Sequence, residues 1–513
     1  MKLLFVSGRS ASLLLSEGGD YFLPRPLALS LRFGAETLPL GEETRSVFSL
    51  FDLQPDTEYT VTARSADGEE DSLVFRTEPE SYTLNVRRFG AAGDGETDDT
   101  PALQAAIACC PAGGRVLVPA GTYRTGPLFL KSHITLEIRR GATLALEKDR
   151  TRFPILPGAT RPAGGGEEDL LLGSWEGNPL DNLASALTGV EVEDVRLIGE
   201  GVIDGRGQEG DWWVTPKVKK RAWRGHLLGL IRCKNIAVQG LTFRNSPSWN
   251  IHPIFSEDLL FADIRVEAPA VSPNTDGFDP ESCKNIRLYG ARFSVGDDCI
   301  AVKSGKIYLG QKRPVPCEGI EIAWCAMLDG HGGVTLGSEM SGGIRNVRVH
   351  HCLMRGNDRG LRIKTRRGRG QHAIIDDIRF EDIRMEGVKA PLVVNCLYFC
   401  DPDGHDPWVQ SREKQPVDEG TPTVGTIVFE RVRAENCGAC AAYALGLPER
   451  PIRKIRVADC RFHFMPDAPG MVPAMADGVP PCHNRGLILQ NVAALEAENV
   501  VFSGITGPEI ADT

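Results

Sequence analysis

Four short polar clusters follow one another in the second half of the chain, and they carry residue types that perform acid–base chemistry. They are PNTDGFD at 273–279, VGDDC at 295–299, GHGG at 330–333 and LRIKTRRGRG at 361–370. Aspartate is depleted in strands and enriched in turns, yet Asp297 and Asp298 lead directly into the apolar segment 299–302. Turns that recur for structural reasons explain one Asp or Gly per repeat. They do not explain carboxylates, a histidine and cations at equivalent positions of successive repeats.

Three carboxylates and a histidine within two repeats supply what the cleavage of a glycosidic bond requires. One acid must keep its proton in order to protonate the leaving oxygen, while another stays ionised in order to activate water. Neighbouring carboxylates cannot all ionise at low cost, so crowding separates their pKa values. We therefore expect the adjacent pair Asp297 and Asp298 to divide into an acid and a base.

A cluster of cations follows, in a chain whose formal net charge is −10. Six of the eleven residues from 359 to 369 are Arg or Lys, and none is acidic. Alternate residues of a strand share a face, so Arg362 and Lys364 point together while Ile363 enters the core. Distant charges are screened at physiological salt, so these local cations indicate an anionic sugar as the ligand. For the segment 366–369, a solvated surface is an equally good interpretation.

The scaffold that must align these clusters is a repeat. Strand-like apolar segments begin at residues 235, 258, 285, 319, 346 and 377, which are 23 to 34 residues apart, with no helical pattern between them. This period is typical of a solenoid, and the lack of intervening helices argues against a doubly wound sheet. We predict an all-β chain with a right-handed parallel β-helix over residues 81–513, whose coils are about 4.8 Å apart.

Two further elements are predicted before the repeats begin. A helix with Thr100 as its N-cap and Pro101 in its first turn would cover the open edge of the first coil. Residues 1–80 would form a separate small β-sandwich. The spacing of Leu53, Pro55, Thr57 and Tyr59, with a hairpin signal at Asp67-Gly68, resembles the corner of a fibronectin type III domain, usually a spacer or a wall. The polar segment 77–81 is the expected linker.

Composition limits the partners and the location of the chain. A net negative charge argues against nucleic acid, and no apolar segment approaches the roughly 20 residues that cross a bilayer. The apolar N-terminus is interrupted at residues 8–10 before a signal peptide forms, so we expect a cytoplasmic protein. Fourteen scattered cysteines indicate reduced, buried thiols and not a disulfide framework.

Taken together, the clusters resemble the four signatures of the polygalacturonases of glycoside hydrolase family 28, which are Asn-Thr-Asp, Asp-Asp, Gly-His-Gly and Arg-Ile-Lys. Here they stand in order at 274–276, 297–298, 330–332 and 362–364, within a resemblance that runs from about residue 82 to the end. The resemblance implies that Asp297 is the general acid and that Asp276 and Asp298 hold and deprotonate the attacking water. His331 would tune the acid or contact the sugar.

The same resemblance implies how substrate is held. Arg362 and Lys364 would grip a galacturonate carboxylate, and Asn274 would orient its neighbours. The family inverts anomeric configuration, which fits a base that works through water. It implies no metal and no organic cofactor, and its substrates are oligogalacturonides or pectic polysaccharide.

Other residues are candidates for the same cleft. Trp249 and His252 lie one coil before Asp276, where lining a subsite and packing in the core are about equally good interpretations. Glu339 follows the His331 strand and is placed to reach the cleft from a loop. The polar segment 400–423 is too long for a simple coil turn and could wall one end of the groove, which favours exo over endo action.

Competing interpretations make different predictions. A rhamnogalacturonan hydrolase shares the fold and ranks second. A pectate lyase would need calcium and would release an unsaturated product. A non-catalytic carbohydrate-binding β-helix would bind oligogalacturonate without releasing reducing ends.

Overall fold

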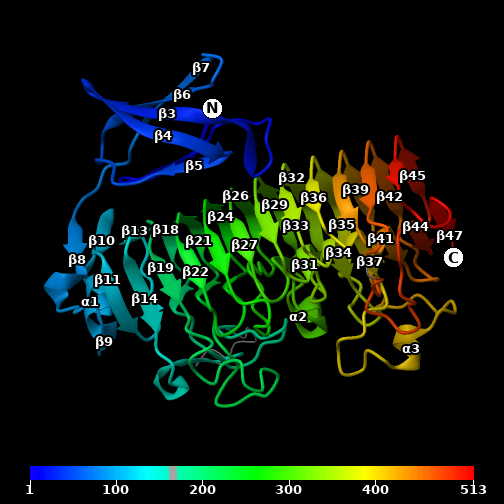
Figure 1. The fold of residues 1–513 in the computed structure, drawn as a ribbon. Coiled ribbons are helices and arrows are strands. Elements are labelled where there is room, and N and C mark those ends of the chain that lie inside the picture. The colour runs from blue at the N-terminus through cyan, green and yellow to red at the C-terminus, as the bar shows by residue number, and fades with distance from the viewer. Residues whose placement is uncertain (161–169, 469, 513) are drawn as a thin grey trace.

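The computed structural model describes residues 1–160, 170–468 and 470–512. Figure 1 shows a small antiparallel β-sandwich lying along the N-terminal half of a long parallel β-helix. The predicted all-β fold, a right-handed parallel β-helix preceded by a small β-sandwich, is confirmed. In the described ranges, no helix has both the length and the apolar character required to span a membrane.

The sandwich is built from two antiparallel sheets of three and four strands. They are β1 (Lys2–Val6), β2 (Ala11–Leu14) and β5 (Val47–Leu50) in one sheet, and β3 (Phe22–Phe33), β4 (Glu36–Arg45), β6 (Glu58–Arg64) and β7 (Glu70–Arg76) in the other. Tyr59 is buried, and its hydroxyl accepts a hydrogen bond from the backbone N–H of Gln54 at 2.8 Å. The more specific likeness to fibronectin type III stays a prediction, as does the domain boundary at residue 80.

Three parallel sheets run the length of the β-helix. The first has fourteen strands, namely β8 (Thr83–Asn85), β10 (Gly114–Val118), β13 (Ile134–Ile138), β18 (Glu193–Ile198), β21 (Lys234–Gln239), β24 (Glu257–Ala262), β26 (Lys284–Tyr289), β29 (Cys317–Ala323), β32 (Ile344–His350), β35 (Ile374–Glu381), β38 (Thr423–Val424), β39 (Thr426–Glu430), β42 (Lys454–Ala458) and β45 (Leu495–Glu498).

The second sheet has thirteen strands, namely β9 (Asp94–Asp98), β11 (Gly121–Thr125), β14 (Ala142–Leu146), β19 (Val202–Asp204), β22 (Thr242–Arg244), β25 (Arg265–Glu267), β27 (Arg292–Ser294), β30 (Ala326–Leu328), β33 (Leu353–Arg355), β36 (Arg384–Glu386), β40 (Arg433–Cys437), β43 (Arg461–Phe464) and β46 (Val501–Ser503). Its strands follow those of the first sheet within each coil.

The third sheet comes in two parts, of four and seven strands. They are β12 (Leu128–Phe129), β17 (Leu187–Val190), β20 (Leu228–Ile231) and β23 (Ile251–Ile254), then β28 (Ile300–Val302), β31 (Gly332–Leu336), β34 (Arg359–Lys364), β37 (Ala390–Asn395), β41 (Cys440–Leu445), β44 (Arg485–Gln490) and β47 (Ile510–Asp512). Parallel bridges from Ile251 to Phe278 and from Phe278 to Ile300 join the two parts.

The predicted repeat is confirmed strand by strand. The six predicted segments form β21, β24, β26, β29, β32 and β35, which are neighbours in this order in the first sheet. Their inward residues are in register, so that Ile286 lies between Leu259 and Ile320, and all three are buried. This stacking of apolar side chains from coil to coil fixes the register, because a slip of one residue would turn them outward.

Short helices lie at the entrance and in the loops. Helix α1 (Thr100–Cys109) buries Leu103 and Ile107 against the first coil, as predicted, but its N-cap is Asp99 and not Thr100. The loops also contain α2 (Ile307–Lys312), α3 (Pro407–Gln410), the 3-10 turns η1 (Val86–Phe89) and η2 (Arg150–Arg152), and an antiparallel ribbon of β15 (Ile155–Leu156) and β16 (Asn182–Leu183). All fourteen cysteines are unpaired, and twelve are buried.

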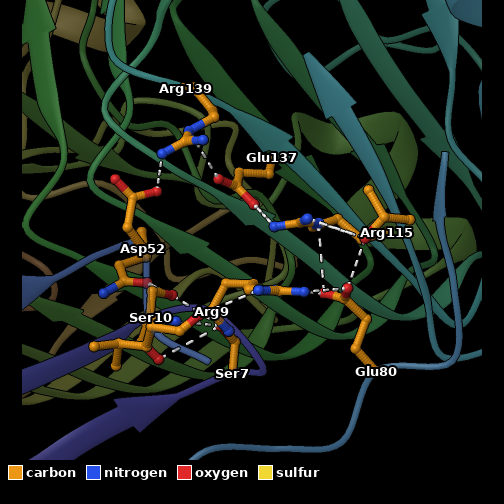
Figure 2. A network of polar contacts seen from close by, with 11 residues as sticks. Ser7, Arg9, Ser10, Asp52, Glu80, Arg115, Glu137 and Arg139 are labelled. Carbon is orange, nitrogen blue, oxygen red and sulfur yellow. Dashed lines mark hydrogen bonds and ion pairs between the residues drawn. The ribbon is translucent and has the colours of Figure 1, made fainter. Parts of the chain in front are cut away.

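The sandwich packs on the outside of the first sheet (Figure 1). Its Phe5, Leu14 and Val47 share an apolar cluster with β-helix side chains, among them Ala237, Leu260, Tyr289 and Trp324. Figure 2 shows the polar edge of this interface, in which Arg9, Glu80, Arg115 and Glu137 alternate in charge. The expected linker 77–81 takes part in this interface through Glu80.

Candidate active site

The four polar clusters meet on the outer face of the third sheet, on the coils that contain β28, β31 and β34. The register pairs Ile300 with Val334 and Thr335 with Arg362. The backbone N–H of Gly277 donates to the carbonyl of Asp298 at 3.0 Å, and that of His331 donates to the carbonyl of Asp297 at 3.1 Å. Equivalent positions of neighbouring coils therefore bring these acidic and basic residues together.

Three carboxylates form the centre of this site. One oxygen from each of Asp276, Asp297 and Asp298 lies within 4.8 Å of the others. Asp276 and Asp298 are 5% and 1% exposed, whereas a quarter of the Asp297 side chain is accessible. Like charges this close in a dry environment cannot all ionise at low cost, so their surroundings must divide their roles.

Asp298 is held as an anion. Its two carboxylate oxygens accept from Arg362 Nη1 at 3.1 Å and from Lys364 Nζ at 2.9 Å. Burial by itself would raise the pKa of Asp298, but Lys364 and Arg362 outweigh burial and hold the pKa well below its usual range. These two cations also supply the positive charge that a divalent metal would bring to the carboxylate cluster.

Asp276 has a different environment. Burial, with the neighbouring Asp297 and Asp279, raises the pKa of Asp276 well above its usual range. In the described ranges its Oδ1 is buried and has no hydrogen-bond partner, while its Oδ2 lies 4.0 Å from Lys303 Nζ. A carboxylate with a raised pKa and an unused oxygen is suited to accept a proton.

Asp297 pairs with the histidine of the third cluster. His331 Nδ1 lies 3.3 Å from Asp297 Oδ1, and the imidazole is about half exposed. The hydrogen bond to Asp297 raises the pKa of His331. The imidazole and the carboxyl group therefore form a hydrogen-bonded pair at the accessible edge of the carboxylate cluster.

Lys303 is a residue of this site that the sequence did not point out. Its Nζ lies 3.3 Å from Asp279 Oδ1, 3.5 Å from Glu339 Oε2 and 3.7 Å from the centre of the Trp249 ring. A signal was present, because residue 303 follows β28 on the face opposite to the core residue Val302. Lysines at outward strand positions are usually exposed, so the sequence provided no reason to expect that Lys303 is buried.

The remaining predicted site residues lie around this centre. Asn274 adopts a left-handed backbone conformation with φ 55°, and its Oδ1 accepts from Arg224 Nη2 at 2.7 Å. Glu339 is 8% exposed, and although burial opposes it, Lys303 with nearby cations lowers the pKa of Glu339 to about 2. Asn274 thus contacts Arg224, and Glu339 contacts Lys303 beside the carboxylate cluster.

Trp249 and His252 lie beneath the surface of the site. Trp249 is 2% exposed and stacks at an interplanar angle of 6° on Trp175. His252 Nε2 contacts Glu281 Oε2 at 2.9 Å, and burial lowers the pKa of His252 to about 3. The structure thus favours packing over direct lining of a subsite, and it gives Trp249 a contact with the site through Lys303.

The last three arginines of the fourth cluster, Arg366, Arg367 and Arg369, do not form a solvated surface, so that interpretation of the segment 366–369 is wrong. All three are at most 5% exposed and pair with acids far away in the sequence. The partners are Asp401 and Asp403 for Arg366, Glu449 for Arg367, and Asp401 for Arg369. These cations fasten the loop around residues 400–413 to the β-helix, which leaves Arg362 and Lys364 to face the carboxylates.

Two segments cross the third sheet, one on each side of the carboxylates. On the side of the earlier coils, Trp175 stacks on Trp249, and Gly177 accepts from the backbone N–H of Lys306 at 2.8 Å. On the other side, Met475 Sδ lies 2.9 Å from Arg362 Nη2, and the Met475 carbonyl accepts from Asn395 at 3.0 Å. The loop at 400–413 supports the second segment through a contact of His405 with Asp477. The sandwich lies on another sheet and is not a wall of this site.

Comparison with known proteins agrees with this arrangement. The model of the glycosyl hydrolases family 28 matches residues 115–409, and that of the rhamnogalacturonase A/epimerase, pectate lyase-like group matches residues 83–137. A probable polygalacturonase of Vitis vinifera is 33% identical over 393 residues, which are 75% of each chain. An exo-poly-alpha-D-galacturonosidase of Dickeya chrysanthemi is 28% identical over 69% of this chain and 64% of its own length, just under two thirds.

Solved structures extend the comparison to the fold. A hyperthermoactive exopolygalacturonase from Thermotoga maritima matches with a TM-score of 0.68 and 28% identity over 83% of this chain and 93% of its own. A family 28 exopolygalacturonase from Yersinia enterocolitica matches over 100% of this chain and 98% of its own, with a TM-score of 0.71 and 18% identity, and supports the fold alone. The family model spans more than half of the chain and includes all four clusters. This chain belongs to the glycosyl hydrolases of family 28.

Proposed function

We propose that the protein hydrolyses α-1,4 linkages between galacturonic acid units of pectin-derived oligogalacturonides, from the end of the chain and with inversion. The observation that carries this proposal is the division of three adjacent carboxylates. Asp298 is fixed as an anion by two cations, Asp276 has a raised pKa and an unused oxygen, and Asp297 lies 3.3 Å from the His331 imidazole at the accessible edge. The relatives named as polygalacturonases support the choice of substrate.

An anionic sugar suits the donors that remain. A guanidinium has five N–H donors and an ammonium has three, so the contacts of Arg362 and Lys364 with Asp298 leave donors for a galacturonate carboxylate. Both cations are less than 10% exposed, where a charge pair is screened much less by salt than at the surface. A neutral sugar would leave these donors without an ionic partner.

The proposed reaction proceeds in one displacement. A water molecule held by Asp276 and Asp298 loses a proton to a carboxylate as its oxygen bonds to the anomeric carbon. The bond from that carbon to the glycosidic oxygen breaks, and the leaving oxygen takes a proton from Asp297, which His331 orients. Arg362 and Lys364 would bind the galacturonate carboxylate and so hold the sugar in place during the step.

The distance between the carboxyl groups is shorter than is usual for an inverting enzyme. Carboxyl groups of inverting glycosidases are usually about 6.5–9.5 Å apart, and those of retaining enzymes about 5–5.5 Å. The closest oxygens here are within 4.8 Å, a spacing that by itself suits a carboxylate nucleophile. We place the water beside the pair of Asp276 and Asp298 and not between acid and base, in accord with the resemblance to an inverting family.

The proposal of exo action is supported by the two crossing segments. The segment with Trp175 and Gly177 and the segment with Met475 lie over the third sheet on opposite sides of the carboxylates. A polymer that continues in both directions would meet one of them, whereas a chain end fits between them. A cytoplasmic location, which we also propose, would favour short imported chains, because polymer does not enter a cell.

Product analysis tests the proposal. The protein is incubated with tri- and tetragalacturonate, products are followed by chromatography, and the first anomer released is read by NMR. We expect monomer alone at early times, with the β anomer released first. Mixed product sizes would overturn exo action, and the α anomer would overturn the water mechanism. Calcium-dependent release of an unsaturated product would indicate a lyase. Binding of oligogalacturonate without release of reducing ends would indicate a carbohydrate-binding protein. Cleavage of rhamnogalacturonan alone would indicate a rhamnogalacturonan hydrolase.

A further inference from the structure

Lys303 is one of the most enclosed cations of the β-helix. The residue is 4% exposed, and its ammonium is surrounded by Asp276, Asp279 and Glu339 at 3.3 to 4.0 Å, with the Trp249 ring below it. Burying an ammonium costs several kcal/mol unless opposite charges compensate. Here three carboxyl groups surround one cation, so the ammonium is shared and each group that ionises receives only part of its charge.

The two carboxylates that border the proposed water differ in how they are neutralised. Asp298 binds Arg362 and Lys364 at hydrogen-bond distance, through both of its oxygens. In the ranges that the structure describes, the one cation within 4.0 Å of the Asp276 carboxylate is Lys303. A carboxylate that two cations hold is a weak base, whereas one with a single shared cation is a stronger one.

We infer that Asp276, and not Asp298, takes the proton from the attacking water, and that Lys303 is the positioning residue that keeps Asp276 ionised and oriented. The inference rests on the proposed function and assigns a role within it. The O–H bond of the water breaks, its proton goes to Asp276 Oδ1, and its oxygen bonds to the anomeric carbon as the glycosidic bond breaks. Asp298 stays an anion throughout and accepts the second hydrogen of the water without removing it.

The other charged groups near Lys303 do not replace it. Those that face Lys303, Asp276 or their direct neighbours are Asp279, Glu281, His226, His252, Glu339, Glu176, Asp297, Asp298, Arg224, Arg362, Arg369, Lys306 and Lys364. Arg224 donates to Asn274 Oδ1 at 2.7 Å, and Arg369 pairs with Asp401 at 2.6 Å. Lys306 pairs with Asp401 at 3.0 Å, and Lys364 pairs with Asp298. Burial raises the pKa of Asp279 to about 8, so this neighbour takes up little of the ammonium charge near neutral pH.

Replacement of the ammonium tests the inference through the pH profile. Lys303→Met removes the attraction that favours ionised Asp276, so its pKa rises further above the ordinary value. The base form is then lost at a higher pH as pH falls. We expect the acid limb of the kcat profile to move up by about one to three pH units, the usual effect of one opposite charge at this range. At a pH below both limbs, kcat should fall about tenfold for each pH unit by which the limb moves.

Two variants separate positioning from structure. Lys303→Arg keeps the charge and should return the acid limb toward the wild-type position. Lys306→Met is the matched control, because it removes a neighbouring cation that is 15% exposed and does not contact Asp276, and its acid limb should stay in place. A Lys303→Met limb that coincides with the wild-type limb would overturn the inference, provided that circular dichroism shows a folded protein.

Azide rescue gives a second readout that does not require Lys303→Met to fold. In Asp276→Ala, azide can occupy the space of the water and carboxylate and bond to the anomeric carbon through nitrogen, without a proton to remove. We expect azide to restore turnover of trigalacturonate and to yield a glycosyl azide in Asp276→Ala but not in Asp298→Ala. Rescue of Asp298→Ala alone would assign the base to Asp298. A wild-type protein that releases no reducing ends would instead refute the proposed function itself.

Discussion

Charged side chains gather at two places on the β-helix, and the two places are built on different rules. At the sandwich interface, Arg9, Glu80, Arg115 and Glu137 alternate in sign, so that each carboxylate faces a guanidinium (Figure 2). At the third sheet, three carboxylates face one another first, and the cations are distributed unequally among them. Charges that alternate in sign neutralise one another and hold the sandwich against the β-helix. Crowded carboxylates instead differ in their affinity for a proton, as acid–base catalysis requires.

The difference is also visible in the pKa values of the acids. At the interface, burial raises the pKa of Glu137, but Arg115 opposes the shift. In the site, Asp276 and Asp298 are adjacent and similarly buried, yet their pKa values move in opposite directions. Burial alone therefore does not decide the state of a carboxylate, and the position of the nearest cations does.

Removal of the proposed acid should give the largest effect. Asp297→Asn keeps the shape of the side chain but cannot deliver a proton, so kcat on trigalacturonate should fall by about 10²- to 10⁴-fold. Because a quarter of the side chain is accessible, the midpoint of denaturant unfolding should change little. Asp377→Asn, on the first sheet beside Arg379, is the matched control and should keep full activity. Equal turnover in both variants would remove Asp297 from the mechanism.

A break in a partly buried ion pair of the interface should reduce stability and leave catalysis unchanged. Arg45 Nη1 binds Asp263 at 2.6 Å, with side-chain exposures of 22% and 10%. In Arg45→Met the buried carboxylate loses its cation, which should cost about 1–3 kcal/mol of unfolding free energy. Burial raises the pKa of Asp263, and Arg45→Met raises it further, so the loss should grow as pH rises from about 4 to about 7. Denaturant unfolding at both pH values measures it, and an equal loss at both would contradict this account.

An exposed pair across the same interface should have the smallest effect. Arg139 contacts Asp52 with side-chain exposures of 42% and 61%, and such pairs contribute about 0–1 kcal/mol. Arg139→Ala should therefore shift the unfolding midpoint much less than Arg45→Met and should leave kcat unchanged. A loss as large as that of Arg45→Met would show that the alternating charges of Figure 2 act as one network.

The repeat and the site signatures were readable in the sequence because both depend on local order. The spacing of apolar segments predicted which strands are neighbours, and the register confirms it. The four signatures predicted the acids and the two cations that meet on the third sheet. The likeness of the corner around Tyr59 to fibronectin type III and the location in the cell stay predictions.

What the sequence did not reveal depends on contacts between distant segments. Arg366 to Arg369 carried the same pattern as a solvated surface, and only pairing with Asp401, Asp403 and Glu449 buried them. Lys303 likewise looked like a surface residue until Asp279 and Glu339 enclosed it.

By itself, the sequence determined the coil period, the all-β class and the residue types that line the site, because a strand's alternation and a repeat's length are written along the chain. Only the tertiary structure decided how the proton affinities of the carboxylates differ. That difference depends on burial and on the distances to cations from other coils, and no local pattern encodes those distances.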